Sequence, residues 1–148
     1  MSSRRSISFI GRAAALALGL TALAVSSAVA ATPSSLTIRE SFQALPCPHK
    51  ARTTVEMEGC YEHQVLAKDR TIDALNGRIY AKLSAAGRRE FIVSNADWVK
   101  YRNQACVSAA SVYSGGSAHP VAYADCLSFM DGSHVSELKT LLAAIPAG

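Results

Sequence analysis

The chain has 148 residues, with 15 Lys and Arg against 11 Asp and Glu, and four cysteines. Three of the basic residues and none of the acidic ones lie in the first 30 positions, so the remainder carries 12 against 11 and is nearly neutral. That balance excludes the basic stripe of a nucleic-acid-binding protein and a strongly acidic surface for a cationic partner.

Residues 1–30 are predicted to be a secretory signal peptide. A basic start precedes an apolar run over residues 13–25, and Ala28-Val29-Ala30 has the small-x-small pattern of a cleavage site. The apolar run is shorter than the roughly 20 residues of a membrane-spanning helix, so we expect no stable membrane insertion after cleavage. The mature chain is therefore expected to begin at Ala31 and to be periplasmic or secreted.

The cysteines all follow the expected cleavage site, and an even number in an exported protein indicates disulfides. Four cysteines allow three connectivities. We favour Cys47–Cys60 and Cys106–Cys126, because each pair is close in sequence and spans one turn or helix start. Each bridge would contribute roughly 3 kcal/mol in the chain-entropy model.

A zinc site is the alternative use of the first two cysteines. Cys47 with His49 and Cys60 with His63 provide two thiolates and two imidazoles, a set that binds zinc tetrahedrally. The spacing is not that of a common zinc module, so the sequence favours a disulfide with two surface histidines and predicts no metal and no cofactor.

The mature chain is expected to be all-α, a small antiparallel three-helix bundle or hairpin stapled by two disulfides. Residues 31–46 read as a flexible or loosely packed arm, in which residues 36–45 could add a helical turn or a short strand against the body, and 47–145 as one helical domain. Thr53-Thr54-Val55-Glu56 is a capping box that begins the first helix. Apolar residues at three- and four-residue steps predict helices over about 53–83, 88–110 and 120–145.

Two charged residues interrupt the apolar stripes of these helices. Asp69 lies in the stripe of the first helix and Arg102 in that of the second. A charge on a core-facing position is costly unless it is paired, so we expect a structural ion pair between them. The alternatives are a functional charge or a misassigned helix face.

A glycine-rich segment connects the second and third predicted helices. Glycines let a backbone approach a partner closely, and loops carry much of protein function, so this segment is the best candidate for a partner-binding loop. The alternative is a plain helix connection that needs positive φ angles. The candidate residues are Tyr113, Gly115, Gly116, Ser117 and His119.

No set of residues specifies a catalytic site. His119, His134 and Asp125 stand near several serines, but no G-x-S-x-G nucleophile motif is present. We therefore predict no catalytic residue and no enzyme, and His134 is expected at the edge of the core.

The motif Trp98-x-x-Tyr101-Arg102-x-x-x-Cys106, followed by Gly115-Gly116-Ser117-x-x-Pro120 and Cys126, resembles the lysozyme inhibitor LprI-like N-terminal domain family. Upstream, Cys47, Glu56 and Cys60 are similar to the opening of that family, and the segment from Asp69 to Leu83 to its first long helix. After its last cysteine the family usually has Thr, Arg and Leu where this chain has Asp131, His134 and Leu138.

The resemblance covers about residues 47–142 and implies a small exported helical domain with paired cysteines. It favours an exported binding module with a protein partner, either a lysozyme that it inhibits or, as the alternative, an envelope protein. In the alternative the chain would be a structural or stress-related component of the cell envelope.

Overall fold

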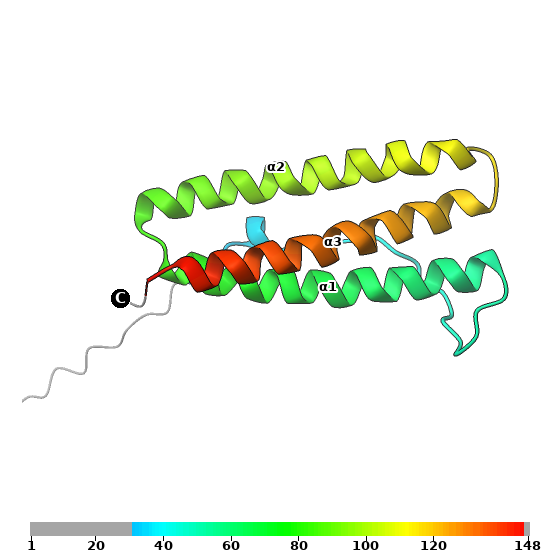
Figure 1. Ribbon diagram of the computed structural model, residues 1–148, viewed down its shortest axis with the longest axis horizontal. Coiled ribbons are helices and arrows are strands. Elements are labelled where there is room, and N and C mark those ends of the chain that lie inside the picture. The colour runs from blue at the N-terminus through cyan, green and yellow to red at the C-terminus, as the bar shows by residue number, and fades with distance from the viewer. Residues whose placement is uncertain (1–30, 147–148) are drawn as a thin grey trace, which may run out of the picture.

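The computed structural model describes residues 31–146 and contains three long helices with no strand among those residues. They are α1 (Thr54–Lys82), α2 (Ala85–Ala110) and α3 (Ala118–Ala144). Figure 1 shows them side by side, with α2 running opposite to α1 and α3. The prediction of an all-α domain with three helices is confirmed. The expected signal peptide, residues 1–30, lies outside the described residues.

Local side-chain chemistry sets where the first two helices begin. In the predicted capping box, Thr53 Oγ1 accepts a hydrogen bond from the Glu56 N–H at 3.2 Å, and Glu56 Oε2 accepts one from the Thr53 N–H at 3.1 Å. Helix α2 begins three residues earlier than expected, because Ser84 Oγ accepts from the Gly87 N–H at 3.2 Å and caps it. Residues 85–87, expected in the turn, are therefore helical.

Helix α3 packs against both other helices, and two apolar clusters fill the space between them. One cluster centres on Ile72, Ile79 and Leu138, with Trp98 and other half-buried side chains around it. The other centres on Val65, Cys106 and Leu127, near the Cys106–Cys126 disulfide.

The segment expected as a flexible arm is packed between α1 and α2. Residues 32–46, called the strap here, include the 3-10 turn η1 (Ser34–Leu36) and run along α1 in the opposite direction. Leu36 is completely buried and Ile38 is 9% exposed. The segment is thus packed and not flexible, and residues 36–45 contact the body without forming a strand, because Leu36 and Ile38 complete the core where α1 and α2 themselves make little contact.

Polar contacts fix the strap in place. The Ile38 N–H donates to Asp73 Oδ1 on α1 at 3.0 Å, and Asn76 Nδ2 donates to the Leu36 carbonyl oxygen at 3.2 Å. Asn76 also donates to Asn95 Oδ1 on α2 at 2.8 Å. Gly59 of α1 allows the closest approach, since a Cβ there would stand 2.5 Å from the Pro46 carbonyl oxygen.

Within residues 31–146, none of the helices combines the length and apolar character needed to cross a bilayer.

Candidate functional site

The glycine loop, residues 113–119, begins with the last residue of the turn η2 (Ser111–Tyr113), which follows α2, and ends in the first turn of α3. The Gly116 N–H donates to the Tyr113 carbonyl oxygen at 3.0 Å, and the His119 N–H donates to the Gly116 carbonyl oxygen at 3.2 Å. Gly115 has φ of 80°, and a Cβ there would meet nothing within 4 Å. This position therefore needs glycine for its backbone conformation and faces open space.

The glycine loop presents its side chains outward. Tyr113 is 50% exposed, and the adjacent Val112 is 77% exposed. Tyrosine is among the residue types that are enriched at protein interfaces. Four of the five candidate residues are exposed and the last is half-buried: Tyr113, Gly115, Gly116, Ser117 and His119.

A shallow pocket of about 250 Å³ lies directly beside this loop. Met57, 38% exposed, lies at the start of α1, and Tyr113 forms the loop side. The sequence alone did not reveal the pocket, because its walls come from two segments that are more than 50 residues apart. The residues lining it are Met57, Tyr61, Tyr113, Ala118, Val121, Ala122 and Asp125.

The two disulfides are formed as predicted. Cys106–Cys126 joins α2 to α3, with Cα atoms 5.4 Å apart, and encloses the glycine loop. Cys47–Cys60 joins the end of the strap region to α1, with Cα atoms 4.6 Å apart. The Cys106–Cys126 bridge therefore fixes the base of the loop, and the Cys47–Cys60 bridge fixes the chain that leads into α1.

The disulfides also bear on the zinc alternative. Cys47 and Cys60 are bonded to each other, which removes the two thiolates that the zinc set required. In the part of the chain described, residues 31–146, no group of three or more His, Cys, Asp or Glu side chains is arranged to hold a metal.

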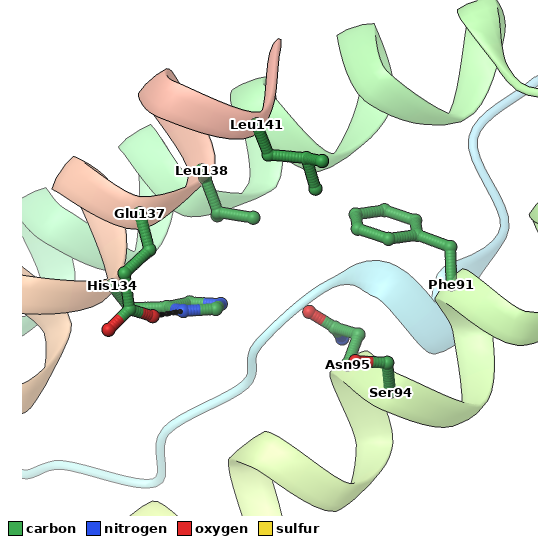
Figure 2. A pocket seen from close by; sticks show the side chains of 7 residues that line it. All are labelled: Phe91, Ser94, Asn95, His134, Glu137, Leu138 and Leu141. Atoms are coloured by element: carbon green, nitrogen blue, oxygen red, sulfur yellow. Dashed lines mark hydrogen bonds and ion pairs between the residues drawn. The ribbon is translucent and has the colours of Figure 1, made fainter. Parts of the chain in front are cut away.

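A second cavity, of about 210 Å³, lies between α2 and α3 at the opposite end of the bundle. Figure 2 shows Phe91 facing Leu138 and Leu141 across it, with Asn95 and His134 beneath. His134 stacks on Trp98 with ring centroids 3.7 Å apart, and its Nδ1 lies 3.0 Å from Glu137 Oε2. His134, whose side chain is 12% exposed, thus lies at the edge of the core.

The most highly charged region of the interior surrounds Arg102, which is completely buried. Its Nη1 donates to Asp69 Oδ1 at 3.2 Å and to Asp131 Oδ1 at 2.9 Å, and its Nη2 bonds Glu40 Oε1. We call these four residues the Arg102 cluster. Its members come from the strap and all three helices, so one guanidinium joins four segments of the chain.

Asp69 and Arg102, the pair expected from the sequence, are therefore joined by two further carboxylates. Sequence reasoning missed Glu40 because the strap was expected to be flexible. It missed the role of Asp131 because Asp131-Gly132-Ser133 has poor helix propensity and suggested a break. Helix α3 continues through this segment, where Asp131 is bonded to Arg102.

Burial and the shared cation shift the pKa values of the cluster. Burial, with the negative charge of Asp131, raises the pKa of Asp69 to about 7, despite the opposing effect of Arg102. Burial also raises the pKa of Asp131. Burial alone would lower the pKa of Arg102, but the carboxylates outweigh it and raise that pKa, so the guanidinium stays charged.

The fold and the loop define the chain as a small, disulfide-stapled, all-α domain with an exposed loop and a packed ionic centre. A family model described as "Lysozyme inhibitor LprI" matches residues 47–138, and the chain belongs to this family. The match spans the glycine loop and three members of the Arg102 cluster, and it begins after Glu40. No curated protein and no solved structure matches the chain.

Proposed function

We propose that the chain is an exported protein that binds and inhibits a lysozyme. Membership of the LprI family carries this proposal, because the description of that family names an inhibitor rather than an enzyme. The two disulfides fit an oxidising compartment outside the cytoplasm, where such bonds persist.

The loop end of the bundle is the proposed binding surface, consisting of the glycine loop with Val112 and Met57. Aromatic residues and methionine are enriched at protein interfaces, and Tyr113 beside the shallow pocket has the character of a central contact. The disulfide Cys106–Cys126 holds both ends of the loop, which reduces the conformational entropy lost on binding.

Inhibition would follow from placing the loop in the sugar-binding cleft. Lysozymes hydrolyse glycosidic bonds with a pair of carboxyl groups. On the loop, the Ser117 hydroxyl and the His119 imidazole can donate hydrogen bonds to those carboxyl groups. The bare backbone at Gly115 and Gly116 lets the loop enter a narrow cleft without side-chain clashes.

The test is a lysis assay with several lysozymes and the disulfide-bonded protein in molar excess. We expect slower lysis with at least one of them. Replacing Tyr113→Ala should weaken inhibition about thirtyfold, the equivalent of about 2 kcal/mol for a central interface residue. Tyr101→Ala is the matched control, because Tyr101 is 64% exposed on α2 outside the loop and should leave inhibition unchanged.

Absence of inhibition for every lysozyme at molar excess would refute the proposal. The alternative of an envelope component would then be examined by recovery of a defined envelope partner whose binding depends on Tyr113. If Tyr113→Ala and Tyr101→Ala weakened inhibition equally, the assignment of the binding surface would be refuted. The proposal that the unaltered protein inhibits a lysozyme would still stand.

A further inference from the structure

The Arg102 cluster contains more negative than positive charge. Glu40, Asp69 and Asp131 supply three carboxyl groups, and Arg102 supplies one guanidinium. The next cation is Lys68, whose Nζ donates to the Ser128 carbonyl oxygen at 2.7 Å and attracts Asp131 electrostatically. With all groups ionised, three negative charges face two positive ones in a buried region.

The geometry places the surplus between Asp69 and Asp131. Both Oδ1 atoms accept from the same nitrogen, Arg102 Nη1, which has a hydrogen for each, so the two carboxyl groups lie close together and share one cation. Their Oδ2 atoms are both buried without a hydrogen-bond partner. A buried carboxylate oxygen that lacks a donor is costly when charged, and two such groups close together repel.

We propose that Asp69 and Asp131 form a proton-binding site, holding one proton between them in the folded protein near neutral pH. One proton removes the surplus charge, since two remaining carboxylates then face Arg102 and Lys68. The proton also neutralises one of the two carboxyl groups whose Oδ2 atom lacks a hydrogen-bond partner. The folded protein therefore takes up a proton that the unfolded chain does not hold at the same pH.

The surroundings of the site agree with this assignment. Asp69 also faces Glu40 on the strap and Asp73 on its own helix, and both raise its pKa further. From α3, Tyr123 lies within the electrostatic range of Glu40 and Arg102. Among these neighbours Arg102 is the group that lowers the pKa of Asp69, and its charge is shared with Asp131 and Glu40.

The consequence is a defined pH dependence of stability. The pKa of Asp69 is about 7 in the folded protein against a usual value of 3.8, so the folded state binds the proton more tightly. This contribution is fully present below pH 3.8 and is lost as the pH rises through about 7. Between pH 5 and pH 8, the folding equilibrium constant should fall on the order of tenfold to a hundredfold through this site.

The direct test is an NMR titration of the side-chain carboxyl carbons of Asp69 and Asp131 in the protein with both disulfides formed. We expect the pair to take up one proton with a midpoint near pH 7. Midpoints near pH 4 for both groups would overturn the proposal. This measurement uses the unaltered sequence and does not depend on any variant folding.

A second test compares urea unfolding midpoints from pH 5 to pH 8. Asp69→Asn keeps the shape of a neutral carboxyl group and should flatten the profile and stabilise the protein at pH 8. Asp97→Asn, which changes an exposed carboxylate on α2, is the matched control and should preserve the profile. A merely structural ion pair predicts that Asp69→Asn destabilises the protein at every pH and leaves the pH dependence of stability unchanged. A folded Asp69→Asn variant with the original pH dependence would therefore contradict the proposal.

Discussion

At the middle of the bundle Arg102 is completely buried and bonded to three carboxyl groups, whereas at the loop end Val112 is 77% exposed and Tyr113 half exposed. The Arg102 cluster joins the strap to all three helices, and none of its four residues is exposed on the surface. The loop end is held at its base by the Cys106–Cys126 disulfide. Stability and the proposed binding thus involve different residues, so mutations can test them separately.

The largest expected effect is at the middle. Arg102→Met removes the cation and leaves the cluster carboxyl groups buried without it, so the free energy of unfolding should drop by about 3–5 kcal/mol. Urea denaturation followed by circular dichroism measures this change. The control is Lys100→Met, which removes an exposed cation from the same helix and should change stability by less than about 0.5 kcal/mol.

A similar loss is expected at the strap. Leu36→Ala should cost about 3 kcal/mol, because it leaves a cavity at a completely buried position between α1 and α2. Thr37→Ala changes the exposed neighbour and should have little effect. If thermal melts showed the two variants to be equally stable, the strap would not be part of the cooperative core.

The disulfides test whether the two regions are separable. Replacing both cysteines of either pair with alanine should cost about 3 kcal/mol, since the loops of 13 and 20 residues are comparable. Only the Cys106–Cys126 double variant should also weaken lysozyme inhibition, because this bridge fixes the base of the glycine loop. Equal weakening by both double variants, measured in the lysis assay where both remain folded, would mean that the loop is not held locally.

The smallest effect on stability is expected in the loop itself. Gly115→Ala places a side chain at φ of 80° and should cost about 1 kcal/mol. Its added methyl group meets nothing within 4 Å, so the cost comes from the backbone alone. Gly116→Ala, at ordinary φ, should be milder in the same thermal melts. Inhibition should fall more for the first variant than for the second.

Much of the architecture follows from local sequence signals. Three signals act over only a few residues and can therefore be recognised in the sequence alone. They are the capping box at Thr53 and Glu56, the apolar periodicity of the three helices and the glycine-rich connection. The disulfide connectivity was also inferred, because each pair is close in sequence. Asp69 and Arg102 were identifiable because a charge in an apolar stripe needs a partner.

The tertiary structure decided what depends on distant partners. The strap looked flexible because its own sequence lacks a regular pattern, and only the gap between α1 and α2 explains why Leu36 and Ile38 are buried there. Glu40 joins the Arg102 cluster from 62 residues away, and Asp131 joins from 29. The sequence by itself therefore determined the helices, the two disulfides and one buried ion pair. The number of carboxyl groups around Arg102, and with it the proposed proton site, depends on long-range packing.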